Sequence, residues 1–276
     1  GLCDLEVPLP VVQGSKEAID AGKNIYTSAY GNFKLREAIA KKQNDFYKQD
    51  VEADNILVSA GATGAFYTTA MTLLNEGDEV VVFEPYYGYH VSTLQSIGCK
   101  IKFIKTLPPH YDIDFDYLSS QITPNTKAIL ICNPSNPSGK VYTKDELNKI
   151  SEIIVQNDMV LFSDEMYEHF IYDGLEFTSA LSIESLKNHT VVISGFSKIY
   201  SITGWRLGYA ISTKEVIDSA SALNDLIYVC PPAPLQYGVL KGLRELPKSY
   251  YTDVADEHQE KRDKFIKALN DRSEER

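Results

Sequence analysis

The stretch VVISGFSK at residues 191–198 decides the fold that the sequence predicts. It begins with a short apolar run and continues through small residues to a lysine, Lys198. An unbroken apolar run is typical of a parallel strand that is covered on both faces, because neither face then needs polar side chains. The stretch therefore predicts a buried strand that ends in a loop carrying Lys198.

The same pattern recurs along the chain. Each short apolar run ends in residues such as Gly, Pro, Asn or Ser, and a helical stretch often follows. The other runs are residues 56–58, 80–83, 101–104, 128–132, 159–162 and 207–211. Strands that alternate with helices predict an α/β fold, with three layers around a mostly parallel central sheet.

The two ends of the chain differ from this pattern. Residues 1–31 are rich in Pro, Gly and Tyr, which predicts an extended arm and a loop. An amphipathic helix is expected at residues 33–47. From about residue 249 the sequence predicts a long charged helix, with Phe265, Ile266 and Leu269 on one face.

Composition excludes several classes of partner. Of the 276 residues, 27 are Lys or Arg and 38 are Asp or Glu, which gives a net charge of −11. A field of this sign repels phosphate backbones and anionic lipid, so neither nucleic acid nor a membrane is expected as a partner. No apolar run approaches the roughly 18 residues of a membrane span, and no secretory signal is visible, so a cytoplasmic location is expected.

The cysteines lie far apart in the sequence and have no histidine at metal-ligand spacing. This pattern disfavours a zinc site and a disulfide framework, and no metal is expected. Cys99 and Cys132 stand among apolar residues and are expected to be small buried hydrophobes. The full set is Cys3, Cys99, Cys132 and Cys230.

Ligands of open α/β sheets bind outside the carboxyl ends of the strands, so the residues after each run are candidates for chemistry. After residues 56–58, small residues that include Ala62 and Thr63 open a helix whose free N–H groups favour an anion. The alternative is an ordinary tight turn. After residues 80–83, Tyr87 belongs to a group of tyrosines that can stack on a flat ligand or pack in a core or dimer.

Polar residues follow the next two runs. After residues 128–132, two Asn-Pro steps fix a rigid turn, which either presents the Asn136 amide as a donor or serves as a plain turn. After residues 159–162, the carboxylate of Asp164 is costly at the end of an apolar strand unless it meets a cation. That cation is either a Lys or Arg of the chain or a protonated ring nitrogen of a ligand.

The last run leads to two cationic residues. Lys198 is either a surface lysine or an amine that forms a Schiff base with a carbonyl compound. Arg206 offers a guanidinium fork for a phosphate group. Taken together, the phosphate cradle, the aromatic plate, the amide donor, the acid and the lysine describe a site for pyridoxal 5′-phosphate (PLP).

With these residues assembled, the sequence resembles the class I/II aminotransferases, which are PLP-dependent enzymes of fold type I. The resemblance covers nearly the whole chain. Its motifs are residues 195–208 (the PLP-lysine signature), 133–139 (the NxxNP[TS]G loop), 164–167 (the D-E-x-Y motif) and an N-terminal block with Tyr26, Thr27, Gly31, Leu35 and Arg36.

The resemblance implies a division of the chain into parts. Residues 1–30 would be an N-terminal arm and loop, residues 31–245 the large PLP-binding α/β domain, and residues 246–276 the start of a small C-terminal domain. In the family this small domain continues further and carries the Arg that clamps the α-carboxylate of the substrate. We therefore expect the chain to be a fragment that lacks this anchor.

The resemblance also implies a role for each matching residue. Lys198 would carry the Schiff base and then move the α-proton of the substrate, with Asp164 paired to the pyridine N–H. Asn136 and Tyr167 would bond the 3′ oxygen of the ring, and Tyr167 counts with Lys198 and Asp164 as catalytic. The remaining cofactor contacts would be Tyr87 on the ring, Ala62, Thr63 and Arg206 on the phosphate, and Tyr26 on the phosphate of the other subunit.

The resemblance has one consequence for assembly, and the sequence departs from the family pattern at one position. The Tyr26 contact implies a homodimer with shared active sites. At Gly195 many relatives have a Ser that contacts the phosphate, so one phosphate contact is expected to be missing here.

The function implied is a PLP-dependent transaminase of amino-acid metabolism. It would move an amino group between an L-amino acid and a 2-oxo acid through the Lys198 Schiff base. One alternative is a C–S lyase or an ACC-synthase-like elimination on the same scaffold. A second alternative is an inactive fragment, or an aminotransferase-like module that senses a ligand.

Overall fold

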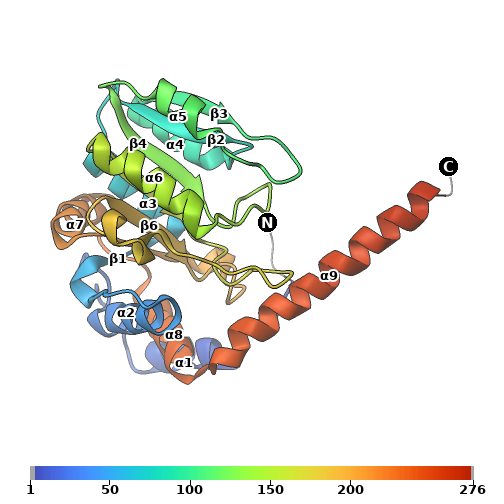
Figure 1. The fold of residues 1–276 in the computed structure, drawn as a ribbon. Coiled ribbons are helices and arrows are strands. Elements are labelled where there is room, and N and C mark those ends of the chain that lie inside the picture. The colour runs from blue at the N-terminus through green and yellow to red at the C-terminus, as the bar shows by residue number, and fades with distance from the viewer. Residues whose placement is uncertain (1–3, 275–276) are drawn as a thin grey trace.

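The computed structural model describes residues 4–274, and its centre is a sheet of seven strands (Figure 1). Every run that was predicted as a strand corresponds to a strand of this sheet, and only Met159 lies outside, one residue before β5, so these predictions are confirmed. The order across the sheet is β1-β7-β6-β5-β4-β2-β3. The bounds are β1 Ile56–Ala60, β2 Glu79–Glu84, β3 Lys100–Lys105, β4 Thr126–Cys132, β5 Val160–Asp164, β6 Thr190–Gly195 and β7 Leu207–Ile211.

The sheet is mostly parallel, as predicted, and β7 is the exception. Parallel pairing joins β6, β5, β4, β2 and β3, whereas β7 runs antiparallel to both of its neighbours, β6 and β1. The start of β7 therefore lies beside the ends of β6 and β1, with Gly208 opposite Gly195 and Leu207 opposite Ala60. Because Arg206 precedes β7, it lies at the edge where the other strands end.

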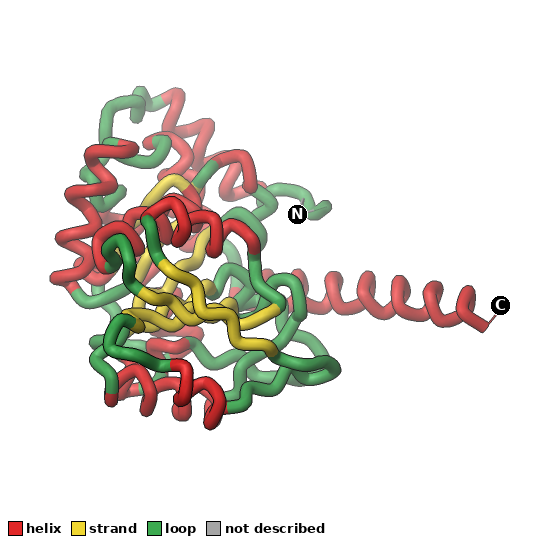
Figure 2. The backbone as a smooth tube through the Cα atoms, turned by 90° about the horizontal axis from the view of Figure 1, so that it is seen from above, coloured by secondary structure: helices red, strands yellow, loops and turns green. Residues whose placement is uncertain are grey.

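Helices cover both faces of the sheet, which gives the expected three layers (Figure 2). Alternate residues of β2 face different helices, because Val82 packs with α3 and α4 whereas Val81 packs with α5 and α6. Helix α7 lies on the first face, and α1, α2 and α8 pack on the second. The helix bounds are α1 Leu9–Asp20, α2 Phe33–Tyr47, α3 Gly61–Leu73, α4 Gly88–Ile97, α5 Phe115–Gln121, α6 Lys144–Gln156, α7 Lys214–Tyr228, α8 Ala233–Glu245 and α9 Lys248–Glu274, with short 3₁₀ turns at Ala53–Asn55, Ala180–Ser182, Glu184–Leu186 and Thr203–Trp205.

Helix α1 corrects one prediction, because residues 9–20 are helical and not an extended arm. Pro10 lies in the first turn, where its missing N–H is not needed. Gly14 packs against α8, and a Cβ on Gly14 would lie only 3.0 Å from the Cα of Gly238. This glycine therefore serves a close helix crossing, although in the sequence it was interpreted as a loop signal.

The long charged helix predicted at the C-terminal end is confirmed as α9. Its first turns pack into the core through Tyr251 and Val254, and its outer part extends away from the body of the molecule (Figures 1 and 2). The apolar residues Phe265, Ile266 and Leu269 on this outer part are exposed.

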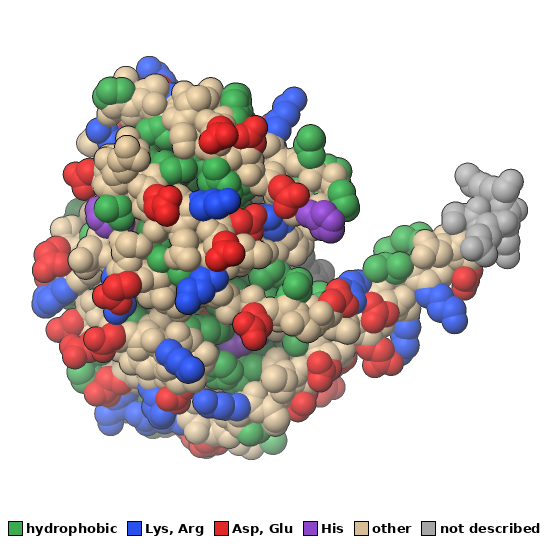
Figure 3. All heavy atoms as spheres, viewed as in Figure 1, with side chains coloured by type: hydrophobic (Ala, Val, Ile, Leu, Met, Phe, Trp, Pro, Cys, Tyr) green, Lys and Arg blue, Asp and Glu red, His purple; other side chains and the backbone are tan. Residues whose placement is uncertain are grey.

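The surface carries acidic and basic side chains interspersed over the visible face (Figure 3). Within residues 4–274, none of the helices combines the length and the apolar character that crossing a membrane requires. Cys99 and Cys132 are buried, as predicted, whereas Cys3 lies outside the described residues.

Candidate active site

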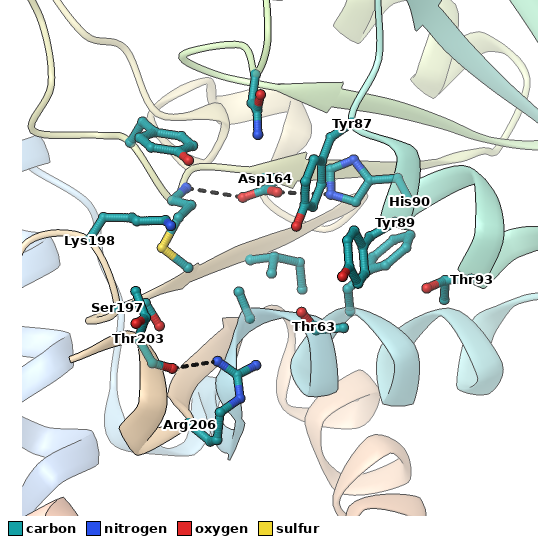
Figure 4. A pocket seen from close by; sticks show the side chains of 16 residues that line it. Thr63, Tyr87, Tyr89, His90, Thr93, Asp164, Ser197, Lys198, Thr203 and Arg206 are labelled. Atoms are coloured by element: carbon teal, nitrogen blue, oxygen red, sulfur yellow. Dashed lines mark hydrogen bonds and ion pairs between the residues drawn. The ribbon is translucent and has the colours of Figure 1, made fainter. Parts of the chain in front are cut away.

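One pocket gathers eight of the nine predicted site residues at the carboxyl edge of the sheet (Figure 4). Tyr26 is the ninth, and it lies outside this pocket with 79% of its surface exposed. Its contact across a subunit boundary stays a prediction. The lining consists of Ala62, Thr63, Phe66, Tyr87, Tyr89, His90, Thr93, Asn136, Asp164, Met166, Tyr167, Ile193, Ser197, Lys198, Thr203 and Arg206.

The topology explains why these residues meet. Strands β4, β5 and β6 are parallel neighbours, so the segments that follow them leave the sheet at one edge. Asn136 and Lys198 lie on the segments after β4 and β6, and Asp164 is the last residue of β5. The three residues are far apart in the sequence. The Lys198 side chain extends into the pocket on the side of Asp164 (Figure 4).

The carboxylate of Asp164 is held from two sides. Its Oδ2 lies 2.8 Å from Nε2 of His90, and its Oδ1 accepts the backbone N–H of Met166 at 3.1 Å. The side chain of Asp164 is only 13% exposed. A carboxylate fixed in this way, at the edge of a pocket, is placed to bind a positively charged ring nitrogen.

His90 is a site residue that the sequence reasoning missed. It is 5% exposed, and its ring meets the Tyr87 ring edge-on with centroids 5.2 Å apart. The available signal was its position in the helix that begins after Tyr87, because His90 lies three residues, about one helical turn, after Tyr87. A single histidine on a half-apolar helix gives no sign of the distant carboxylate that it contacts.

The anion end of the pocket is the start of α3 beside Arg206. The residue before this helix, Ala60, gives no side-chain cap, and Ala62 and Thr63 of its first turn line the pocket, where a helix start favours an anion. Arg206 Nη1 donates to the carbonyl of Thr203 at 2.9 Å, which fixes the guanidinium there (Figure 4). Gly61 has a φ of +77°, and a Cβ there would overlap that guanidinium, so only glycine leaves room for it.

Gly195 has a packing reason for lacking a side chain. A Cβ at this position would lie 3.0 Å from the Cα of Gly208 and 3.1 Å from the Cε of Met166. The two strands thus approach closely where the lysine loop begins. Ser197 and Thr203 also line the pocket and bring hydroxyl groups to it.

The aromatic wall consists of Tyr87 and Tyr89, whose rings are stacked with centroids 5.2 Å apart. Burial raises the pKa of Tyr87, so its phenol stays protonated at neutral pH. A neutral ring that keeps its hydroxyl proton offers a flat apolar surface to a planar ligand.

The loop that carries Asn136 is tied at both ends. The Asn133 side chain donates to the carbonyl of Thr178 and accepts the N–H of Tyr142. The backbone N–H of Asn136 donates to Sγ of Cys132 at 3.4 Å. The rigid turn that the two Asn-Pro steps predict is therefore reinforced by side-chain contacts.

Comparison with known proteins identifies the family. The sequence profile described as "Aminotransferase class I and II" matches residues 3–275. A probable aspartate aminotransferase of Methanocaldococcus jannaschii is 34% identical over 274 residues, which are 97% of this chain and 72% of that protein. The aspartate aminotransferase of Sulfolobus acidocaldarius is 33% identical over 79% of this chain, and the match spans 55% of that protein.

Solved structures agree with this result. A double mutant of the aspartate aminotransferase of Thermus thermophilus has a TM-score of 0.94 and 30% identity, over 99% of this chain and 72% of that one. This likeness extends over the sheet and over the helices on both of its faces. The profile match, the shared fold and the pocket described above lead to one conclusion: the chain belongs to the class I and II aminotransferase family.

Proposed function

We propose that this chain binds PLP and moves an amino group between an L-amino acid and a 2-oxo acid. The observation that carries the proposal is the convergence of Lys198, Asp164 and Arg206 on one pocket. A lysine amine, a carboxylate and a phosphate-binding cation are the groups that a PLP enzyme needs at separate points of the cofactor. The relatives named aspartate aminotransferase support amino-group transfer as the reaction.

The residues of the pocket fit this cofactor. The uncapped start of α3 and Arg206 offer donors for the phosphate, and Gly61 leaves that corner open. Asp164 would hold the proton on the ring nitrogen, Tyr87 would cover one face of the ring, and Asn136 and Tyr167 would bond the 3′ oxygen.

Each residue then has a task in the reaction. When bound, PLP supplies an electron sink for the electrons that remain when the α-proton of the amino acid is removed. The amine of Lys198 would hold the cofactor covalently until the amino group of the substrate takes its place, and the released amine would then take the proton from the α-carbon as general base. The carboxylate of Asp164 keeps a positive charge at the ring nitrogen, while His90 keeps that carboxylate in place.

We also propose that two copies of the chain share their active sites. Tyr26 is exposed, and so are Ile25 and Leu226. Single exposed apolar residues are common, but a phenol that is to reach the phosphate of another subunit has to be accessible in one chain. In this proposal Tyr26 of each copy bonds the phosphate in its partner.

A panel of L-amino acids tests the reaction itself. At least one of them should convert the visible absorbance of the PLP-loaded chain to that of the aminated cofactor, and a 2-oxo acid should restore it. The α-methyl analogue of the active amino acid is the matched control, because it has no α-proton to remove, and it should cause no conversion. Release of ammonia and pyruvate without any 2-oxo acid would instead establish an elimination. Unchanged absorbance with every amino acid would leave an inactive fragment or a ligand-sensing module.

Replacing Arg206 by glutamine tests the phosphate site. The affinity for PLP should fall about 10- to 100-fold, because hydrogen bonds to a charged group contribute about 1.5–3 kcal/mol. Titration of the cofactor-free protein with PLP, followed by absorbance, measures this change. Arg244→Gln on the surface of α8 is the control and should bind PLP as the unchanged protein does. If both variants had the same affinity for PLP, Arg206 would not contribute to phosphate binding.

A further inference from the structure

We propose that the buried pair of Lys42 and Glu168 is a positioning device for the active site. The pair would fix the turn that carries Asp164 and Tyr167, together with the strand that leads to Lys198. This inference rests on the function proposed above, because it assigns the pair a purpose through those three residues. Neither Lys42 nor Glu168 lines the pocket, so they would act on it from outside.

The pair joins two distant parts of the chain. Nζ of Lys42, on α2, lies 2.6 Å from Oε1 of Glu168, which follows β5. The side chains of Lys42 and Glu168 are only 6% and 3% exposed. Ion pairs at the surface of a protein are loose and screened, whereas a buried pair this short holds its two elements at a fixed separation.

The same carboxylate collects contacts from both strands beside the lysine loop. Oε1 of Glu168 accepts the hydroxyl of Ser194 in β6 at 3.1 Å and that of Tyr209 in β7 at 3.4 Å. Gln43, next to Lys42 on α2, donates to Oε2 of Glu168 at 3.4 Å and to the Tyr209 hydroxyl at 3.0 Å. One side chain therefore ties α2 to the strands on either side of the Lys198 loop.

Glu168 also belongs to the turn that holds the catalytic carboxylate. Its N–H donates to the carbonyl of Glu165 at 3.1 Å, and the N–H of Glu165 donates to the carbonyl of Ile193 at 2.7 Å. The N–H of Phe170 donates to the carbonyl of Tyr167 at 2.8 Å, in the same turn. A displacement of Glu168 would therefore displace Tyr167, which precedes it, and loosen the backbone next to Asp164.

The charges around the pair are well defined. Burial alone would raise the pKa of Glu168, but the Lys42 ammonium, together with His169 and hydrogen bonds to the carboxylate, lowers that pKa to about 2. Burial raises the pKa of Glu165 to about 8, so this neighbour is neutral at pH 7. The Glu168 carboxylate is thus paired with the Lys42 ammonium, and neither charge is left without a partner.

Stability alone is a weak reason for such a pair. Two apolar side chains of the same volume often give a protein that is at least as stable, because charges lose their hydration when they are buried. What apolar residues cannot replace is the set of directed contacts from one carboxylate to α2, β6 and β7. The pair therefore supplies geometry rather than net stability.

The test compares a single variant with a double one. Lys42→Met leaves the Glu168 carboxylate unpaired and should lower the thermal midpoint. Lys42→Met combined with Glu168→Met should restore part of that midpoint, because the unpaired charge is gone but the buried donors of Ser194, Tyr209 and Gln43 lose their acceptor. If the pair positions the site, the double variant should still show hydrogen exchange at least about tenfold faster in residues 164–170 of the cofactor-free protein. Its kcat in the PLP-loaded form should fall at least about tenfold as well. The exposed pair of Glu260 and Lys264, replaced by methionine in the same way, is the control and should change neither quantity.

The outcomes separate the two proposals. A double variant with wild-type stability, wild-type exchange at residues 164–170 and wild-type kcat would show that the pair is only structural. The exchange measurement needs neither cofactor nor turnover, so a chain that converts no amino acid would overturn the proposed function without deciding this point. If the double variant does not fold, Glu168→Gln keeps the volume and gives the same measurement, and unchanged exchange in that variant would overturn the inference.

Discussion

Replacing Lys198 by alanine is expected to abolish turnover and the visible absorbance of the lysine-bound cofactor. The variant loses both the amine that would hold PLP covalently and the base that would remove the α-proton. General bases contribute about 10²–10⁴-fold on their own, so kcat should fall by at least about 10⁴-fold. Absorbance spectra and single-turnover kinetics measure the two effects. The fold should survive, because Lys198 is half-buried on a loop at the sheet edge.

Lys198→Arg separates covalent attachment from charge. A guanidinium keeps the positive charge in the pocket but does not form a Schiff base with an aldehyde, because it stays protonated. Loss of absorbance in both variants is therefore expected. Activity in Lys198→Arg close to that of the unchanged protein would mean that position 198 serves only as a cation for the phosphate. Lys267→Ala on the exposed part of α9 is the neutral control.

Much of this site could be predicted because it follows from the sheet. Asn136, Asp164 and Lys198 each come shortly after an apolar run, and the ends of parallel strands meet at one edge. Once the runs are recognised as strands, the convergence of these residues needs no knowledge of side-chain contacts. Arg206 joins them for a different reason, which is that β7 is antiparallel and begins where β6 ends.

Other features depend on contacts that a sequence pattern does not contain. The Nε2 of His90 lies 2.8 Å from Asp164, and the two residues are separated by 74 positions in the chain. Lys42 and Glu168 are separated by 126 positions. Both pairs arise from the way in which a helix docks on the strand ends. The helix at residues 9–20 was missed for a related reason, because Gly14 is explained by the helix that it crosses and not by its neighbours in sequence.

The replacement of Asp164 by asparagine should lower kcat by about 10²–10³-fold while leaving the fold intact. Losing one preorganised electrostatic contact to a developing charge has an effect of this size. The amide has the shape of the carboxylate and can keep both present contacts. Its oxygen can accept the N–H of Met166, and its NH₂ can face Nε2 of His90 if that ring carries its proton on Nδ1.

What the amide lacks is the negative charge that, in the proposed function, would hold a proton on the ring nitrogen of the cofactor. The variant should therefore bind PLP and form the covalent bond between PLP and Lys198, yet it should remove the α-proton slowly. A kinetic isotope effect with α-deuterated amino acid should increase in Asp164→Asn, because proton removal becomes the slow step. Asp253→Asn on the surface of α9 is the control and should leave kcat unchanged. If Asp164→Asn kept the kcat and isotope effect of the unchanged protein, the charge of Asp164 would have no part in the reaction, and its contact with His90 would be structural only.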